Sequence, residues 1–421
     1  MTQPEIAIVG AGAAGIGAAM ECADRGISCI LLEAADRIGG RAHTDSHSLP
    51  APWDKGCHWL HCADENPLVP WADRLGAVYD TSGDDENFVG WSHGAFLTTS
   101  EANECHATVE AAFDAIYDAG EAGRDVAIPT VLPDAGRWAP HVRCILQLLI
   151  GDDPEADSAA AYAYYDDTEA DWPVRSGLGA LVAAMAHGLD IRLNTPVTKI
   201  TQTTSGARLE TPTGTLTADA AIVTASTSVL ASGAIQFGAG PASDLLGTMS
   251  HLSCGAFEKV AFALPRLPDE LKGKEYLLIE TGNSDPVVEF QIVHGVHPML
   301  ICNIAGSPAR DLAALPDPAR VDFARSRLET VFGSDLTRTI THAATTDWLN
   351  DPLIRGSYSR TDPGFAQHRL DMIAADTGRV AFAGEAFSLD WQATAHGAWQ
   401  SGRDVAARMA RHVTGGAKNT S

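Results

Sequence analysis

The stretch Glu5-Ile-Ala-Ile-Val-Gly10-Ala-Gly12-Ala-Ala-Gly15 decides the fold class of this chain. Its apolar half predicts a buried strand, its three glycines predict a tight turn, and the sequence that follows predicts a helix up to about Arg25. A second apolar strand is predicted over residues 27–33, and it ends in Glu33. A strand, a glycine turn, a helix and an acidic strand end at this spacing are the fingerprint of a βαβ unit that binds a dinucleotide.

Each glycine of the turn has its own physical role. Gly10 permits the tight turn, Gly12 lets the backbone approach a pyrophosphate, and Gly15 allows the helix to pack closely on the strand. The pyrophosphate is expected at the N-terminus of the helix, so we include Ala13 and Ala14 among the cofactor-binding residues.

Glu33 is expected to accept hydrogen bonds from the adenosine ribose of the dinucleotide, and its charge disfavours a 2′-phosphate. The turn and Glu33 are equally compatible with NAD and FAD. The glycine turn without any ligand is the alternative interpretation, and the strand, helix and acid around it argue against that alternative.

The composition excludes several classes of function. Lys and Arg number 29 against 54 Asp and Glu in 421 residues, a formal net charge of −25, which leaves no basic footprint for a nucleic acid. Hydrophobic residues make up 45% and charged residues 20%, as in globular proteins. No apolar run approaches the roughly 18 residues of a membrane helix. We therefore expect neither a nucleic acid nor a membrane as a partner.

The start of the chain and its cysteines point to one compartment. The first residues show no basic segment or cleavage site of a signal peptide, which predicts a cytoplasmic protein. The 8 cysteines are scattered without metal-ligand spacing, so we expect free thiols and no metal site.

Sheet-forming and helix-forming segments alternate along the rest of the chain. Residues 101–172 are alanine-rich and acidic with helical spacing, which predicts a mainly helical insertion. The remaining predicted helices cover residues 178–189, 318–332 and 396–412. The remaining predicted strands cover residues 190–193, 197–200, 207–210, 214–217, 220–225, 259–264, 287–293, 299–304, 339–345 and 379–384.

Two further segments carry a resemblance to a known family. Leu32-Glu33-Ala34-Ala35-Asp36-Arg37-Ile38-Gly39-Gly40-Arg41 follows the second strand, and Ala383-Gly384-Glu385 lies near the far end, shortly before Ala395-His396-Gly397. Through these residues the chain resembles the flavin-dependent amine oxidases, which include monoamine oxidases, polyamine oxidases and histone demethylases. The resemblance implies that the dinucleotide is FAD. It adds these residues to the cofactor-binding set: Ala34, Arg41, Val197, Gly384, Glu385, Thr394 and Ala395.

The resemblance also implies an architecture, an α/β fold with an FAD-binding Rossmann-like (GxGxxG) domain, a discontinuous α+β substrate-binding domain and the helical insertion. Because the two sheet types alternate along the chain, each domain is expected to be built from separate segments. The FAD-binding domain would comprise residues 1–80, 174–254 and 346–415. The substrate-binding domain would comprise residues 81–173 and 255–345.

The segment Gly56-Cys57-His58-Trp59-Leu60-His61 resembles the part of the family that passes the flavin ring, with His61 facing the substrate. By the same resemblance Lys259 matches the lysine that holds a water near flavin N5, and Trp348 and Tyr358 match the stretch at the substrate face of the flavin. The alternatives are a hydrogen-bonded polar residue for His61, a surface lysine at a strand edge for Lys259, and a core residue for Trp348.

Three departures from the family pattern are informative. Ser357 stands where monoamine oxidases carry the cysteine joined to the flavin, so non-covalent FAD is expected. Thr394 stands where many members carry the second tyrosine of an aromatic pair around the amine. Amino-acid oxidases of this fold carry, just after the glycine at position 56, an arginine that holds the substrate carboxylate, whereas His58 and Trp59 follow Gly56 here. A carboxylate substrate is therefore disfavoured, because a buried carboxylate without a partner is costly.

The resemblance implies an FAD-dependent oxidase: hydride passes from the carbon α to an amine nitrogen to flavin N5, oxygen is the second substrate, and an imine and hydrogen peroxide form. One alternative is a dehydrogenase or desaturase of the same fold that acts on a non-amine substrate with another electron acceptor. Another is an interaction protein in which FAD is structural. The identity of the amine, the electron acceptor and the oligomeric state stay open, with a homodimer among the candidates.

Overall fold

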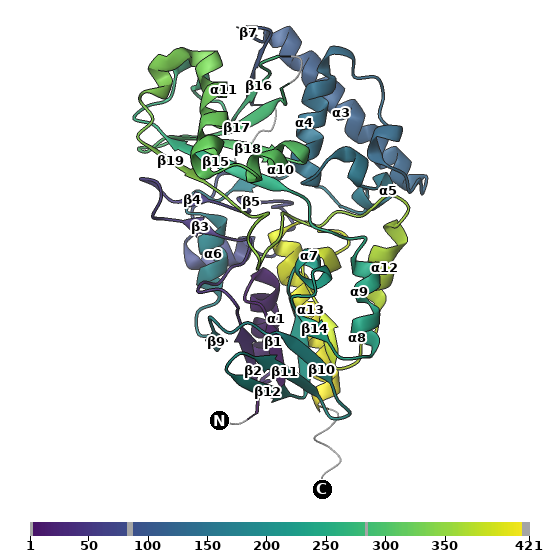
Figure 1. Cartoon of the computed structure of the whole chain (residues 1–421). Coiled ribbons are helices and arrows are strands. Elements are labelled where there is room, and N and C mark those ends of the chain that lie inside the picture. Colours follow the sequence, from purple (N-terminus) through teal and green to yellow (C-terminus); the bar gives the residue numbers. More distant parts are fainter. Residues whose placement is uncertain (1–2, 82–86, 283–284, 415–421) are drawn as a thin grey trace.

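The computed structural model describes residues 3–81, 87–282 and 285–414 (Figure 1). A parallel sheet lies in the lower part of the molecule in this view, and a larger mixed sheet lies in the upper part. A helical segment, α3 to α5, flanks the larger sheet.

The parallel sheet begins with the predicted βαβ unit, β1 (Ile6–Val9), α1 (Ala13–Asp24) and β2 (Cys29–Leu32). Its strand order is β20-β13-β1-β2-β9. The other three strands are β9 (Ile191–Arg192), β13 (Ala220–Val223) and β20 (Val380–Phe382). All residues of β1, β13 and β20 are buried, as expected of parallel strands that are covered on both faces.

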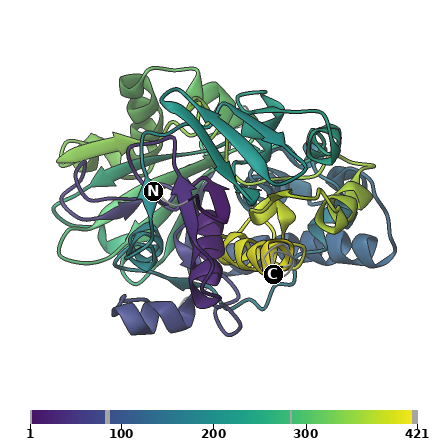
Figure 2. The same cartoon turned by 90° about the horizontal axis from the view of Figure 1, so that it is seen from below.

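Helix α13 (Ala395–Thr414) lies beside α1 on one face of this sheet (Figure 2). Glycines make the close crossing sterically feasible: a Cβ on Gly17 would lie 2.2 Å from the carbonyl oxygen of Trp399, and one on Gly402 would lie 1.9 Å from that of Ala14. The other face packs on a small sheet of order β12-β11-β10-β14. Its strands are β10 (Lys199–Gln202), β11 (Ala207–Thr211), β12 (Gly214–Ala218) and β14 (Gln236–Phe237).

The larger sheet has the order β19-β15-β18-β17-β16-β6-β7. Its strands are β6 (Phe88–Ser92), β7 (Ala95–Phe96), β15 (Phe257–Ala263), β16 (Tyr276–Ile279), β17 (Val288–Val293), β18 (Met299–Ala305) and β19 (His342–Thr345). Helices α10 (Ser307–Ala313) and α11 (Asp317–Thr337) pack through the apolar cluster on one face. The sequence missed β6, β7 and β16, which are short and, in β6, interrupted by Gly90.

The predicted insertion is mainly helical, with α3 (Thr99–Glu121), α4 (Ala139–Ile150) and α5 (Ala159–Tyr162). It ends in β8 (Trp172–Pro173), which pairs with β5 (Trp59–Leu60). The other strands and helices are β3 (Thr44–Asp45), β4 (Trp53–Asp54), α2 (Val69–Leu75), α6 (Leu178–Met185), α7 (Thr227–Ala231), α8 (Pro241–Asp244), α9 (Leu246–Met249) and α12 (Ala366–Ala374). Single 3₁₀ turns lie at Ile128–Thr130, Gly136–Trp138, Pro154–Ala156, Asp269–Leu271 and Glu385–Phe387.

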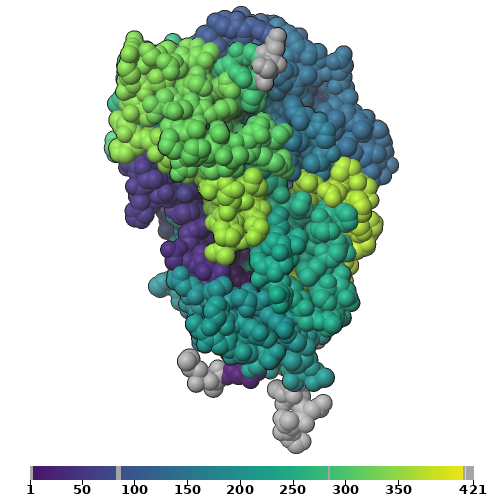
Figure 3. Space-filling model, viewed as in Figure 1, coloured from purple at the N-terminus to yellow at the C-terminus, as the bar shows by residue number. Residues whose placement is uncertain are grey.

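Both sheets are assembled from segments that are far apart in the chain. On the surface, the green upper part meets the teal lower part, with chain from around residue 350 between them (Figure 3). The domain boundaries given above remain a prediction. Within the described ranges, no helix combines the length and apolar character that a membrane span requires. All eight cysteines are free thiols, and the same ranges hold no group of three or more potential metal ligands.

Candidate active site

A cavity of about 1660 Å³ is lined by residues of the glycine turn, the segment at 55–61, the large sheet and the helical insertion. This volume exceeds the range of about 300–1,000 Å³ usual for a drug-sized ligand, so it has room for a dinucleotide and a substrate together. All of the predicted site residues except Gly15 line it.

The glycine turn forms one end of the cavity. Gly10 has a φ of 103°, which favours glycine, and Gly12 lies at the N-terminus of α1. No side chain of the described residues caps α1, so its first N–H groups are available to bind an anion such as a pyrophosphate. Gly15 lies behind the turn, where a Cβ would be 2.0 Å from the carbonyl oxygen of Gly10. Gly15 therefore serves packing, as its position in the motif predicts.

Glu33 lies at the end of β2, beside the turn. Its carboxylate accepts hydrogen bonds from the backbone N–H groups of Ala11 at 2.7 Å and Ala35 at 2.8 Å. Each oxygen retains acceptor capacity for a ribose hydroxyl. Glu33 thus also fixes the turn itself, a second role that the sequence alone did not indicate.

Arg41, which is partly exposed, and the buried Glu385 form an ion pair on the cavity wall, 3.0 Å apart. Burial acts to lower the pKa of Arg41, but Glu385, Cys254 and Cys57 together outweigh burial, and the pKa is raised. Glu385 also accepts from the N–H and hydroxyl of Ser359 and from the N–H of Ala393. Its carboxylate therefore joins three segments of chain that meet beside the cavity.

Asp54, which is 2% exposed, anchors the residues after Gly56 through its carboxylate. Its carboxylate contacts Nδ1 of His58 at 2.8 Å and accepts from the N–H of Leu178 at 3.0 Å, at the N-terminus of α6. The intervening Cys57 is a thiol, because burial raises its pKa to about 12. The segment is thus pinned to a helix end while it lines the cavity.

Lys259 is 4% exposed and lies on β15, which is flanked by β18 and β19. It is therefore not a surface lysine at a strand edge. Its Nζ donates to the carbonyl oxygens of Gly56 at 2.7 Å and Asp54 at 3.1 Å. Because an ammonium has three donors, one remains for a water in the cavity. Burial lowers the pKa of Lys259, and Asp54 partly opposes this effect.

Trp348 and Tyr358 are each fixed by a polar group. Trp348 donates from Nε1 to the carbonyl oxygen of Lys55 at 3.0 Å, and the Tyr358 hydroxyl donates to the carbonyl oxygen of Leu148. Burial raises the pKa of Tyr358, so its hydroxyl remains protonated. The ring of Phe257 lies 6.3 Å from that of Tyr358.

His61 lies on another part of the wall. Its Nδ1 is 2.8 Å from Asp171, and its ring is 6.0 Å from that of Trp59. The Asp171 contact fixes the orientation of the imidazole. His61 is thus hydrogen-bonded, as the alternative interpretation expects, and it lines the cavity; its role toward a substrate stays a prediction.

Thr394, at the position where many family members carry a second tyrosine, has a structural role. Its hydroxyl accepts from the N–H of Gly397 at 3.0 Å and donates to the carbonyl oxygen of Trp391 at 2.8 Å. It therefore caps the first turn of α13, the second helix whose N-terminus meets the cavity.

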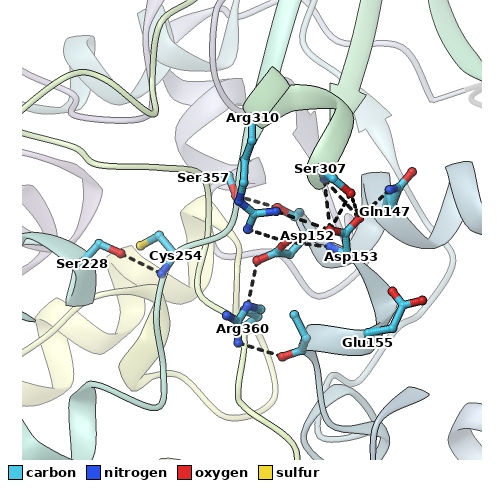
Figure 4. A network of polar contacts seen from close by, with 12 residues as sticks. Gln147, Asp152, Asp153, Glu155, Ser228, Cys254, Ser307, Arg310, Ser357 and Arg360 are labelled. Atoms are coloured by element: carbon cyan, nitrogen blue, oxygen red, sulfur yellow. Dashed lines mark hydrogen bonds and ion pairs between the residues drawn. The ribbon is translucent and has the colours of Figure 1, made fainter. Parts of the chain in front are cut away.

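A polar network lies behind the loop that carries Ser357 and Tyr358 (Figure 4). Asp152 is 1% exposed and contacts Arg310 at 2.6 Å and Arg360 at 2.8 Å. The Ser357 hydroxyl donates to the carbonyl oxygen of Gly151 at 3.2 Å. These contacts tie the loop to the end of α4 and to α10, and they hold Tyr358 at the wall.

Sequence reasoning missed several lining residues on the large sheet and the insertion, namely Tyr162, Phe257, Tyr276, Glu289 and Asn303. Only the alternation of inward and outward positions along β17 and β18 could have signalled Glu289 and Asn303, and that pattern does not say what the inward face lines.

The fold and the cavity define a dinucleotide-binding oxidoreductase with a buried lysine and aromatic walls. The model of the flavin containing amine oxidoreductases matches residues 88–410, and that of an NAD(P)-binding Rossmann-like domain matches residues 8–75. The chain belongs to the flavin-containing amine oxidoreductase family. The predicted family, fold class and FAD cofactor are thereby confirmed, and the protein is an FAD-dependent oxidoreductase that acts on amines.

Relatives and solved structures agree with this assignment. The chain is 29% identical to polyamine oxidase 4 of Oryza sativa subsp. japonica over 95% of this chain and 87% of that protein. It is 24% identical to human lysine-specific histone demethylase 2 over 96% of this chain and 53% of that protein. Its fold resembles cyclohexylamine oxidase from Brevibacterium oxydans IH-35A, with a TM-score of 0.82, 22% identity and coverage of 98% and 100%.

Proposed function

We propose that the protein oxidises an amine that is cationic in solution and reacts with its attacked nitrogen neutral, with a diamine or polyamine as the preferred class. In this proposal oxygen is the electron acceptor and hydrogen peroxide is released. The observation that carries the substrate class is the charge of the cavity wall. The insertion contributes carboxylates to the described lining and no Lys or Arg: Glu110, Glu121, Asp157, Asp166, Asp167, Glu169 and Asp171. Such a wall favours a cation over a carboxylate substrate.

The residues of the chain would divide the work as follows. The first turn of α1, Arg41 and Glu33 would hold the dinucleotide, and the segment at 56–59 would pass its flavin ring. FAD, when bound, supplies the acceptor for a hydride from the α-carbon, which is the carbon bonded to the amine nitrogen. Lys259 would hold a water at its third donor, and Tyr358 would exclude solvent beside the reacting carbon.

A second wall supports an organic amine with an apolar chain. Phe113 and Tyr117 on α3 lie 6.2 and 6.1 Å from the ring of Tyr162, and all three line the cavity. Aromatic rings pack against methylene chains and also attract an ammonium over their faces. The names of relatives such as the polyamine oxidases are consistent with this class of substrate.

The test is a peroxidase-coupled assay on purified yellow protein with a panel of monoamines, diamines and polyamines. Peroxide formed in proportion to oxygen consumed supports the oxidase. If amines reduce the flavin under anaerobic conditions but turnover occurs only when an artificial acceptor is added, the electron acceptor of the protein is not oxygen. No flavin reduction by any amine would refute the proposal. A cytoplasmic location and a homodimer are separate proposals, to be tested by cell fractionation and light scattering.

A further inference from the structure

Three glycines from distant parts of the chain cross beside the ring of Tyr358. Gly151 ends α4, Gly255 precedes β15, and Gly356 lies in the loop that carries the tyrosine. A Cβ on Gly255 would lie 2.0 Å from the carbonyl oxygen of Gly151, and one on Gly356 would lie 2.4 Å from that of Gly255. The N–H of Gly255 also donates to the carbonyl oxygen of Tyr358 at 3.0 Å. The insertion, the large sheet and the loop therefore meet here backbone against backbone.

Gly151 packs directly against the aromatic ring. A Cβ on Gly151 would lie 2.6 Å from Cε2 and 2.9 Å from Cζ of Tyr358. Because carbon atoms in contact are about 3.5–4.0 Å apart, a single methyl group at this position would displace the ring by about 1 Å. Tyr358 lines the cavity and Gly151 does not, so the glycine lies behind the ring and the displacement is directed toward the cavity.

Asp152, the residue after Gly151, holds this crossing together. Its carboxylate is 1% exposed and contacts Nε of Arg360 at 2.8 Å, two residues beyond Tyr358 (Figure 4). The Tyr358 hydroxyl donates to the carbonyl oxygen of Leu148 in the last turn of α4. The loop is thus tied to the helix end on both sides of the ring. The helix end and the loop therefore cannot separate easily to make room for a larger residue at position 151.

We propose that Gly151 is a positioning residue: because it has no side chain, the Tyr358 ring lies close to the end of α4 and leaves room for the amine beside its reacting carbon. This inference rests on the proposed function, because it takes Tyr358 to border that carbon. A side chain at position 151 would narrow the cavity at this wall. Since a densely packed wall yields little, the loss should grow with the bulk of the amine.

The test compares purified holoenzyme of wild type, Gly151→Ala and the control Gly76→Ala. Gly76 ends α2 with a φ of 69°, and Gly151 ends α4 with a φ of 73°, so alanine meets the same backbone strain at both positions. A Cβ on Gly76 would have no further heavy atom of the described residues within 4 Å. The control therefore reproduces the strain without the contact to the ring.

We expect both variants to retain FAD. For Gly151→Ala, kcat/KM should fall about 10- to 100-fold, with the larger losses for the bulkier amines of the panel, because a misplacement of about 1 Å at a reacting centre can cost a hundredfold. For Gly76→Ala, kcat/KM should stay within about threefold. Anaerobic stopped-flow absorbance of the flavin shows whether the loss lies in amine binding or in the rate of flavin reduction. A loss in Gly151→Ala no greater than in the control would overturn the proposal.

A double-mutant cycle with Tyr358→Leu covers the case in which Gly151→Ala alone does not fold. Leucine lacks the ring atoms that the new Cβ would meet, so Gly151→Ala should lower Tm by only about 2–5 °C in that background, as Gly76→Ala does in wild type, and by clearly more when the ring is present. An equal decrease in both backgrounds, or a double variant that does not fold, would show that Gly151 serves only the helix end. Absence of flavin reduction by every amine in wild type would instead refute the proposed function.

Discussion

Replacement of Lys259 by methionine is the most informative single perturbation of the site. Lys259 is buried, and its Nζ bridges the carbonyl oxygens of Asp54 and Gly56. Methionine retains an unbranched apolar stem of similar length and removes only the charged donor. The variant should therefore fold and bind FAD, and it isolates the contribution of the ammonium.

Two opposing effects set the change in stability. Loss of two hydrogen bonds from a charged donor costs about 1.5–3 kcal/mol each. Removal of a buried ammonium returns several kcal/mol of desolvation, roughly the same amount. We therefore expect the free energy of unfolding to change by no more than about 2 kcal/mol, or a shift in Tm of no more than about 5 °C.

The effect on the rate should be larger. Loss of one preorganised donor in an active site costs about 3 kcal/mol in the activation free energy, which corresponds to roughly a hundredfold. If the third donor of Lys259 holds a water beside the flavin, this loss should affect flavin reduction by the amine or the later reaction with oxygen, whereas binding of FAD should be unchanged.

The difference in stability between wild type and Lys259→Met should also depend on pH. Burial holds the pKa of Lys259 below the ordinary value of 10.5. Between this lowered pKa and about pH 10.5 the unfolded chain binds a proton that the folded protein does not, so the stability of wild type rises with pH across that window. The variant lacks this contribution, and the comparison should shift in favour of wild type as the pH rises.

Stopped-flow absorbance of the flavin resolves the two half-reactions, and urea unfolding at several pH values measures the stability. Wild-type rates in both half-reactions, with FAD bound normally, would show that Lys259 has only a structural role. A stability difference that moved towards the variant with rising pH would contradict the lowered pKa.

Three substitutions and one measurement on wild type test the cofactor end of the cavity. Gly12→Leu should fold but lose bound flavin, because a Cβ there lies 3.8 Å from the Gly39 carbonyl oxygen and the longer side chain enters the pyrophosphate path. Gly15→Ala should instead lower Tm by several degrees, because its Cβ meets the Gly10 carbonyl. Differential scanning calorimetry and flavin absorbance distinguish the two outcomes. Glu33→Ala should weaken FAD binding at least tenfold and destabilise the apoprotein by about 1–3 kcal/mol, since two backbone N–H groups lose their acceptor; unchanged flavin affinity would exclude the ribose contact. Acid precipitation of wild type should release all FAD to the supernatant, because Ser357 offers no thiol, and flavin in the pellet would contradict non-covalent binding.

The cofactor half of the fold could be predicted because its signals are local. The strand, turn and helix around Gly10 and the acid at Glu33 lie within one short stretch. The residue types of each segment are compatible with only a few backbone conformations. The structure places β1, α1 and β2 close to their predicted bounds. The strand β20 and the helix α13 were found for the same reason, as a short apolar run and a periodic helix.

The substrate half could be predicted only in outline. Strands β15, β17 and β18 were recognised individually, but the sequence does not give their register, and the register is what brings Lys259, Asn303 and Glu289 into one row. The role of Glu33 in fixing the glycine turn escaped prediction because hydrogen bonds from a side chain to backbone groups leave no periodic pattern in the sequence.

The contrast between the two halves follows from what each must recognise. The pyrophosphate is bound mainly by backbone N–H groups, so only glycines and small residues at fixed spacing are needed, and the motif stays visible. An amine with an alkyl chain is recognised by side chains that converge from several elements, as Tyr162, Phe257 and Glu289 do from α5, β15 and β17.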